Sequence, residues 1–465
     1  MTYTVQAEAA RALHEHLLNS ETIPFPPSLQ EAAKKVKSTG DSAPLLEHPQ
    51  IKAEIAKGDI YQMTKPIHQQ CTNVYQTKDG RWYHLHGSMN AAHTMRMVGV
   101  PEQDVTIQEA QKIYMGRVAQ WDAAEIDRVV NEEFRQAGVI YNTPEEFFAS
   151  EHGKIMAKEP LYTLKPRPSP RKPWPAAKDP SRPLAGIRVI DLSRAIAAPV
   201  ISKILAVLGA EVLKVDLSTG KRDTNLNLKS EGGKAAFAEL VRGADVVVDG
   251  YRPGVLAKLG FDAEELRKLN PGLIYTRENC YGWQGPLSHR SGWQQVSDCL
   301  VGISWMQGRF LGLDEPVVPL LPNSDYQMGL VGASAVCHAL LTRANEDTTF
   351  DIDVSLTQYN IWYYRLGEQS AEIQRSLREK HAGLKLRHYD EMLSLITKTY
   401  AAVRNVRPDL FQRPQYFEPP SGKEWGVDGD IQILTTPFKL EGSVLKYDVP
   451  SGSKGRSEAK WEGDV

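Results

Sequence analysis

Two patterns of apolar and polar residues divide the chain. In its first third, apolar residues recur at helical spacing in AARALHEHLL, IQEAQKIYMGRVAQW and AAEIDRVVNEEFRQAG. From residue 184 onward, short apolar runs typical of buried strands alternate with segments of helical spacing. The change of pattern predicts two domains of different architecture.

Residues 1–163 are predicted to form a helical segment followed by a small α+β domain. In NVYQTKDGRWYHLHG, two alternating segments flank Asp79 and Gly80, which predicts a β-hairpin with its turn at that pair. Residues 164–183 are rich in proline and basic residues and have no apolar period. This composition predicts a linker between the domains.

Residues 184–465 are predicted to form a Rossmann-like domain. The strands expected are GIRVIDLS, EVLKVD, DVVVDG and GLIYTREN, with APVISKILAVLGA and AAFAELVRGA among the helices between them. Such alternation favours an α/β fold with a mostly parallel sheet. Because ligands bind at the carboxyl ends of parallel strands, the loops after Leu192, Asp216, Val248 and Tyr275 should form the site. The chain ends in a polar tail, SGSKGRSEAKWEGDV, predicted to be mobile.

Composition excludes several classes of protein. The 55 basic and 57 acidic residues give a net charge of -2, which offers no footprint for nucleic acid or an anionic membrane. No apolar run approaches the roughly 20 residues of a membrane span, and the first residues do not resemble a secretory signal. The four cysteines form no metal or disulfide pattern, so we expect no metal and a cytoplasmic location. His381 and His388, seven residues apart, are expected to be surface or packing residues.

Considered singly, the candidate functional residues each allow a functional and a purely structural interpretation. The loop SRAIAAP lacks the glycines of a dinucleotide-binding turn, which argues against NAD. Lys221 and Arg222 suit phosphate contacts, but taken alone such a pair is more often a solvated surface feature. Tyr251 with Arg252 suits adenine stacking or a simple helix start equally. In PLLPNSDYQMG, Asp325 alone would be interpreted as a helix cap.

Taken in order, these segments resemble class III CoA-transferases. The segments are LAGIRVIDLSRAIAAP, GKRDTNLNLKSEGG, ADVVVDGYRPGVLAKLGF, LNPGLIYTRENCYGWQGP and NSDYQMG. This CaiB/BaiF family includes formyl-CoA and carnitine CoA-transferases and alpha-methylacyl-CoA racemases. The resemblance runs through residues 184–356 and, more weakly, IQILTTPFKLEG. It implies an acyl-CoA:carboxylate CoA-transferase with a CoA thioester and a carboxylic acid as substrates, no permanently bound cofactor, and a homodimer.

The resemblance also implies roles for individual residues. In such transferases an aspartate attacks the thioester, giving a mixed anhydride and then an enzyme-bound CoA thioester, and Asp325 is the matching residue. We expect the helix dipole to favour its ionised form. The CoA-binding candidates are Arg194, Ala195, Ala197, Lys221, Arg222, Tyr251, Arg252 and Lys258. The substrate-binding candidates are Trp293, Tyr281, Gln294 and Gly329.

The sequence departs from the family in three places. Trp293 stands at the position of the racemase histidine, and tryptophan cannot exchange a proton, which disfavours a racemase unless His289 or His338 acts differently. Gly250 replaces a common asparagine, and the segment between KVD and GKR is shorter than usual. A racemase, isomerase or lyase in which Asp325 acts as a general acid or base, possibly without CoA, and an idle binding scaffold are the alternatives.

Domain order is the other departure. Residues 73–148, which resemble the family's small domain, precede the sheet domain instead of lying within or after it. Because family dimers are interlocked rings, a chain rearranged in this way could complete the ring by itself or with a partner. Both arrangements stay open at the level of sequence.

Overall fold

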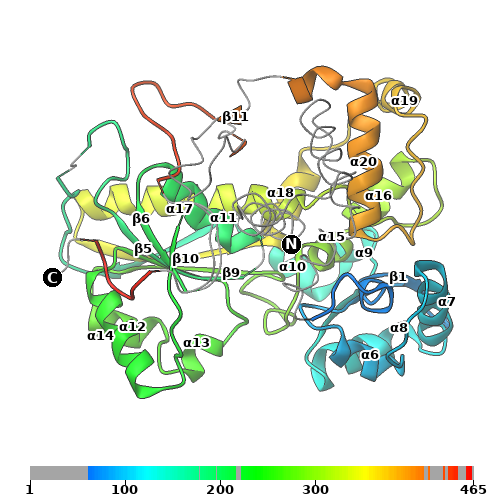
Figure 1. Cartoon of the computed structure of the whole chain (residues 1–465), viewed down its shortest axis with the longest axis horizontal. Helices are drawn as coiled ribbons and strands as arrows, with labels where there is room; N and C mark the ends of the chain where they lie inside the picture. The colour runs from blue at the N-terminus through cyan, green and yellow to red at the C-terminus, as the bar shows by residue number, and fades with distance from the viewer. Residues whose placement is uncertain are drawn as a thin grey trace, which may run out of the picture.

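The computed structural model describes residues 61–176, 179–194, 196–215, 221–412, 417–418, 433–434, 438–448 and 457–462. Within this part of the chain, a sheet domain and a smaller domain lie side by side (Figure 1). The helix predicted in AARALHEHLL lies outside the described residues, as do Ala195 and Asp216.

The sheet domain contains a seven-stranded sheet in the order β4-β10-β9-β8-β5-β6-β7. Every neighbouring pair is parallel except β4 and β10, which are antiparallel. The predicted α/β fold with a mostly parallel sheet is therefore confirmed. The strands are β4 (Thr163–Pro168), β5 (Arg188–Leu192), β6 (Glu211–Lys214), β7 (Arg222–Asp223), β8 (Val246–Asp249), β9 (Ile274–Asn279) and β10 (Thr348–Ser355).

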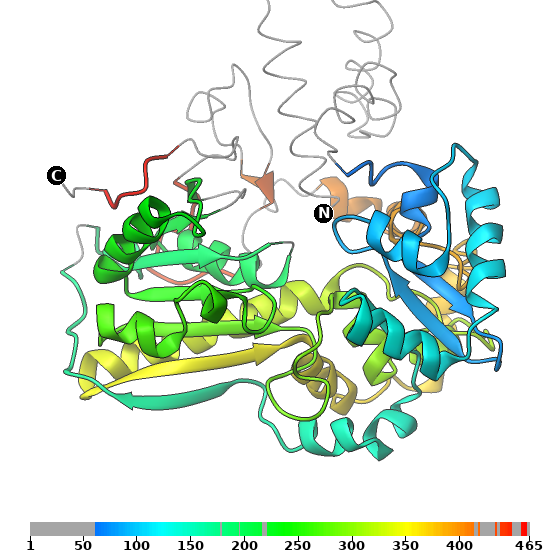
Figure 2. The ribbon, with the colours of Figure 1, turned by 90° about the horizontal axis from the view of Figure 1, so that it is seen from below.

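Helices cover both faces of this sheet, as Figures 1 and 2 show. One face is covered by α12, α13 and α14, and the other by α11 and α17. Covering both faces explains why a central strand such as β8 is buried along its whole length. The helices of this domain are α11 (Ala197–Val207), α12 (Glu231–Gly243), α13 (Val255–Lys258), α14 (Ala263–Leu269), α17 (Asn323–Asn345) and α18 (Leu356–Arg365).

The small domain is built on three antiparallel strands, β1 (Asn73–Gln76), β2 (Trp82–His86) and β3 (Ala137–Ile140). The first two form the predicted hairpin, with Gly80 at a φ of 77° in the turn. The helices around them are α5 (Pro66–Gln69), α6 (Ala92–Val98), α7 (Ile107–Val118), α8 (Ala123–Arg128), a π-helical turn (Val129–Glu133), α9 (Pro144–Ala149) and α10 (Glu151–Met156).

The segment predicted as a linker, residues 164–183, begins inside the large sheet. Its first residues belong to β4, which pairs with β10 at the sheet edge. Proline lacks an N–H group and is tolerated on an edge strand, so the proline content does not prevent pairing. A basic residue of this segment also forms an ion pair across the sheet edge, since Lys165 Nζ lies 2.5 Å from the carboxylate of Asp353 on β10. The domain boundaries themselves stay a prediction, as does the homodimer.

The C-terminal third returns to the small domain. Gln69 donates a 3.1 Å hydrogen bond to Glu391, which precedes α20, and Asn73 donates one of 2.9 Å to the carbonyl of Tyr389. This contact places α20 beside a domain encoded more than 300 residues earlier. The remaining elements are α15 (Gln294–Val301), α16 (Ile303–Phe310), α19 (Ala371–Lys380), α20 (Met392–Val406), a 3-10 turn (Pro408–Gln412), β11 (Phe417–Glu418) and β12 (Ile433–Leu434).

The prediction of a mobile C-terminal tail is wrong for residues 457–462. Trp461 is only 2% exposed and donates a 3.0 Å hydrogen bond to the carbonyl of Leu240 on α12. Arg188 also lies over its ring, 5.5 Å from the centroid. A single large aromatic side chain therefore fixes this part of a polar segment, because its burial contributes far more than its neighbours do.

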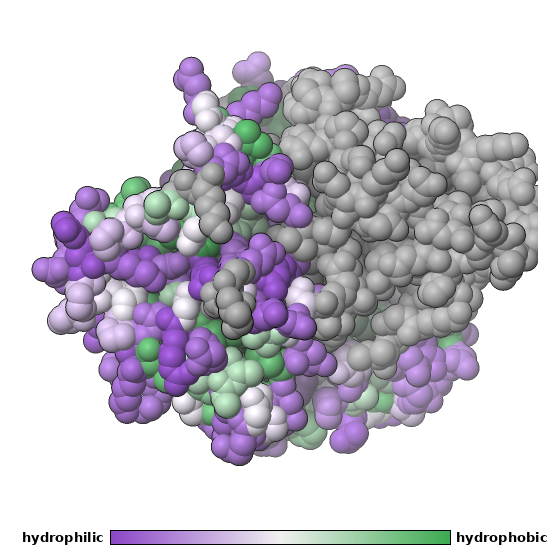
Figure 3. Space-filling view, turned by 60° about the vertical axis from the view of Figure 1, so that its left-hand side comes forward, coloured by the Kyte–Doolittle hydropathy of each residue, from purple (hydrophilic) through white to green (hydrophobic). Residues whose placement is uncertain are grey.

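The visible surface of the described sheet domain is mainly hydrophilic, with small scattered apolar groups (Figure 3). No helix among the described residues combines the length and the apolar composition needed to cross a membrane.

Helices α11 and α17 approach each other closely at two glycines of α17. A Cβ atom on Gly329 would lie 2.6 Å from Val200 and 2.9 Å from the carbonyl oxygen of Ala197. A Cβ on Gly332 would lie 2.5 Å from Ile201. The two helices can pack at this distance only because these positions have no side chain.

We predict that Gly329→Ala lowers the free energy of unfolding by about 1–3 kcal/mol, the usual cost of overpacking a core. Gly383→Ala is the matched control, because a Cβ there meets nothing within 4 Å. Chemical denaturation of both variants measures the difference. Equal stability of the two variants would contradict the close packing of α11 against α17.

Candidate active site

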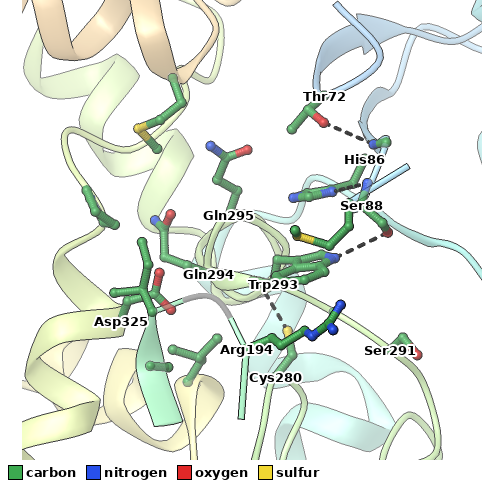
Figure 4. Close-up of a pocket in the computed structure, with 18 of the residues that line it drawn as sticks. Thr72, His86, Ser88, Arg194, Cys280, Ser291, Trp293, Gln294, Gln295 and Asp325 are labelled. Carbon is green, nitrogen blue, oxygen red and sulfur yellow. Dashed lines mark hydrogen bonds between the residues drawn. The ribbon is translucent and has the colours of Figure 1, made fainter. Parts of the chain in front are cut away.

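A cavity of about 600 Å³ is lined by residues from the carboxyl ends of the parallel strands and from the small domain. The loops after β5, β8 and β9 contribute to it, as predicted for strand ends. The start of α17, the small domain and the start of α20 complete its wall. Figure 4 shows the side chains that line it.

Asp325 lines this cavity from the first turn of α17 and is only 8% exposed. Burial, and then the charge of Asp298, raises the pKa of Asp325 to about 8. The expectation that the helix dipole keeps this carboxylate ionised is therefore wrong. A helix N-terminus stabilises an anion by at most about 2 kcal/mol, whereas a rise of this size corresponds to roughly 6 kcal/mol at 1.4 kcal/mol per unit of pKa.

Asp298, on α15, is a buried acid that receives three hydrogen bonds. Ser324 donates to it at 2.8 Å and Asn360 at 2.7 Å, and the Gln294 amide donates to its other oxygen. Burial raises the pKa of Asp298 to about 6 although these donors act in the opposite direction. Asp298 is thus the carboxyl group in this cluster with the most hydrogen-bond support for a negative charge.

Glu278, at the end of β9, is the third acid of the cluster and lines the cavity. Burial raises the pKa of Glu278 to about 8, and the charges of Asp325 and Asp249 add to the rise. Because like charges at close range resist simultaneous ionisation, ionisation of one of these acids opposes ionisation of the others.

An aromatic wall faces this acidic side of the cavity. The Trp293 ring stacks on His86 with centroids 5.5 Å apart and planes 10° apart, and Trp293 Nε1 donates to Ser88 Oγ at 3.3 Å. Burial holds the pKa of His86 well below its usual range. His86 Nδ1 accepts a 2.9 Å hydrogen bond from the Ser88 N–H, so the neutral ring carries its proton on Nε2. Figure 4 shows these residues opposite Asp325.

Four of the predicted CoA-binding residues line the cavity: Arg194, Ala197, Tyr251 and Arg252. They come from the loops after β5 and β8 and from the start of α11. Ala195, between two of them, lies outside the described residues.

The other basic residues predicted to contact CoA do not line the cavity. Lys221 is fully buried, and its Nζ donates to Asp191 and to the carbonyl of Pro199, each at 2.7 Å. Arg222 donates to Glu211 at 2.7 Å. Lys258 is exposed at the end of α13 and does not line the cavity. In this structure, therefore, the side chains of Lys221 and Arg222 form ion pairs within the protein.

Only two of the four predicted substrate-binding residues line the cavity. Trp293 and Gln294 line the cavity. Tyr281 is fully buried behind it, where its hydroxyl donates to the carbonyl of Gly138 at 3.3 Å. Gly329 serves the packing of α17 on α11. His289, which contacts Glu132 at 3.0 Å, does not line the cavity.

Several cavity residues were not predicted from the sequence. His86 and Ser88 come from the small domain, Glu278 from β9 and Gln295 from α15. Gln295 is buried, and its Oε1 has no hydrogen-bond partner among the described residues. The segment WYHLHGS was assigned to a hairpin, but no local signal showed that its end faces Asp325. Three apolar residues of α20 also line the cavity: Met392, Leu393 and Ile396.

Within the described part of the chain, no three His, Cys, Asp or Glu side chains gather where they could hold a metal ion. His388 contacts Glu315 at 2.9 Å and packs against the ring of Trp82, with centroids 4.7 Å apart.

Comparison with known proteins assigns the chain to a family. Residues 184–220 and 216–389 match CoA-transferase family III. The chain is 39% identical over 426 residues to the acetyl-coenzyme A transferase nodX of Hypoxylon pulicicidum, covering 85% of this chain and 71% of that protein. It is 32% identical over 324 residues to an acyl-CoA transferase of Gibberella moniliformis, covering 64% of this chain and 57% of that protein. The chain thus spans little more than half of the second relative.

Solved structures show a more distant similarity. A CaiB/BaiF family protein from Brucella suis matches with a TM-score of 0.42 and 21% identity, covering 59% of this chain and 97% of that one. On the family match and the first relative, the chain belongs to CoA-transferase family III, the CaiB/BaiF family. It is an acyl-CoA transferase of this family.

We predict that Asp325→Asn stabilises the protein increasingly as pH rises from 5 to 8. A carboxyl group whose pKa is higher in the folded state binds more protons when folded, so its cost in stability grows from its unfolded pKa of about 3.9 up to the folded value and stays constant above it. The slope is at most about 1.4 kcal/mol per pH unit. Urea unfolding at several pH values measures the difference between variant and parent.

Glu379→Gln on α19 is the control, since Glu379 is exposed and its removal changes only one surface charge. A difference between Asp325→Asn and the parent that does not grow with pH would exclude a buried, mainly protonated Asp325.

Proposed function

We propose that this protein transfers CoA from an acyl-CoA thioester to a carboxylic acid, with Asp325 as the nucleophile. The observation that supports it is the position of Asp325. It is the acid at the start of α17, in a cavity that also contains the strand-end loops expected to hold CoA. The relatives named as acetyl-CoA and acyl-CoA transferases agree with an acyl-CoA donor.

In the first half of the reaction, a carboxylate oxygen of Asp325 attacks the thioester carbonyl carbon. The carbon–sulfur bond breaks, CoA leaves as the thiolate, and a mixed anhydride joins the acyl group to Asp325. The thiolate then attacks the Asp325 carbonyl. The donor leaves as a free carboxylate, and Asp325 carries CoA as a thioester.

The second half repeats these steps with the acceptor. The acceptor carboxylate attacks the Asp325 thioester and expels the CoA thiolate, which then attacks the acceptor carbonyl of the new anhydride. The product is the acceptor's CoA thioester, and the Asp325 carboxylate is regenerated. No water takes part, so the cavity between the sheet domain, the small domain and α20 should limit the access of water to both anhydrides.

Burial gives Asp325 a specific role in this chemistry. A carboxylate stripped of water is a stronger nucleophile than a solvated one, but it must first lose its proton. Because the pKa of Asp325 lies near 8, a minority of molecules carry the ionised form at neutral pH. The first step should therefore become faster as pH rises toward 8.

Arg194, Ala197, Tyr251 and Arg252 are the proposed CoA contacts. Two guanidinium groups and an aromatic ring on neighbouring strand-end loops suit the phosphates and the adenine of CoA. Lys221 has a different role in this proposal. Its buried ion pair with Asp191 fixes the loop that begins α11.

We predict that acyl-CoA with hydroxylamine inactivates the enzyme and converts Asp325 to a hydroxamate. Hydroxylamine attacks the activated Asp325 carbonyl of the thioester, releasing CoA. Peptide mass spectrometry locates the modification, and Asp325→Asn should show neither modification nor transfer. Full transfer activity in Asp325→Asn, or modification at another acid, would contradict the assignment of Asp325 as the nucleophile. Deuterium incorporation at the substrate α-carbon without hydroxamate would instead favour an isomerase.

We also predict that Asp298→Asn moves the rising limb of the pH–rate profile to lower pH. Removing a neighbouring negative charge lowers the pKa of Asp325, because Asp298 contributes to its rise. Single-turnover rates across pH 5 to 9 measure the shift.

Ser324→Ala is the control, since it removes one hydrogen bond to Asp298 and leaves the acid in place. An Asp298→Asn profile that is unchanged, or that moves to higher pH, contradicts electrostatic coupling between the two acids.

A further inference from the structure

The cavity has a second region that the CoA contacts do not occupy. It lies between α20 and the small domain, and we call it the acyl end; its wall includes Thr72, His86, Gln295, Met392, Leu393 and Ile396. In Figure 4, Thr72, His86 and Gln295 lie on the α20 side of Trp293, whereas Arg194 lies on the opposite side. An acyl group attached at Asp325 can extend toward this region.

The α20 face of the acyl end is apolar. Met392, Leu393 and Ile396 occupy the first turns of the helix at the spacing that places residues on one face. Leu393, which lines the cavity, is 45% exposed. A ligand in the cavity would cover it.

Charged groups in and near the acyl end are acidic or already paired. Glu391, at the start of α20, and Glu278 both line the cavity. Arg290, which also lines it, donates at 2.8 Å to Asp127 and at 2.8 Å to Glu132. No lysine is among the described residues that line the cavity. A second carboxylate placed here would therefore lie beside two further carboxyl groups and would meet no unpaired cation among the described residues that line the acyl end.

We propose that the acyl end selects acids with a single carboxyl group and an apolar remainder, and that it disfavours dicarboxylic acids. This inference rests on the proposed transferase function and names its substrate class. An apolar chain gains by covering the α20 face, at about 25 cal/mol per Å². A terminal carboxylate would lose part of its hydration without gaining a cationic partner among the described residues.

The test compares hexanoyl-CoA with adipoyl-CoA, two donors of equal chain length, in the hydroxylamine trapping assay at Asp325. We expect hexanoyl-CoA to label Asp325 at least about tenfold faster at low donor concentration. Leu393→Arg should reduce or reverse this preference, because it adds a cation at an exposed position that tolerates a charged side chain.

Thr397→Arg is the matched control. It lies one turn further along α20, is exposed and does not line the cavity, so it should leave the preference unchanged. Equal labelling by the two donors, or faster labelling by adipoyl-CoA, overturns the inference while the transferase proposal stands. Absence of labelling by both donors overturns the transferase proposal as well. A preference that falls equally in Leu393→Arg and Thr397→Arg also counts against the acyl end.

Discussion

The close packing of α11 against α17 is the constraint on which the cavity depends. Gly329 and Gly332 let the two helices meet almost backbone to backbone. The first turn of α17, which carries Asp325, is thereby held beside the loop that leaves β5 and begins α11. Bulkier residues at these positions would separate the helices and move the acid away from the strand-end loops. Small residues in α17 thus set the position of Asp325 in the site.

Burial then decides the electrostatic character of the site. Asp298, Asp325 and Glu278 are all buried; the charge of Asp298 opposes ionisation of Asp325, and the charge of Asp325 opposes ionisation of Glu278. Such an arrangement costs stability, which proteins tolerate where the groups have a chemical use. Hydrogen bonds are distributed unequally among them, because Asp298 receives three donors. The three acids therefore differ. Hydrogen bonds favour the ionised form of Asp298, whereas Asp325 and Glu278 favour the protonated form.

Much of the fold could be predicted because its signals are local. The apolar run of β8 and the Asp79–Gly80 turn are each encoded within a few residues, and Asp325 was found through a family motif. The roles of Lys221 and Arg222 were not predictable, since their ion-pair partners Asp191 and Glu211 lie on other strands. The dipole argument for Asp325 failed because burial outweighs a helix terminus, and sequence alone does not show how deeply an acid is buried.

The distribution of the cavity wall along the chain has a consequence for folding. Its parts come from residues near 70–90, from the sheet domain, and from α20 near residue 395. Such long separations mean high loop-closure entropy and slow formation of the final contacts. During synthesis the hairpin and the sheet can form well before α20 has left the ribosome. The complete cavity wall is therefore among the last features to form, and the acidic cluster is more accessible to water until then.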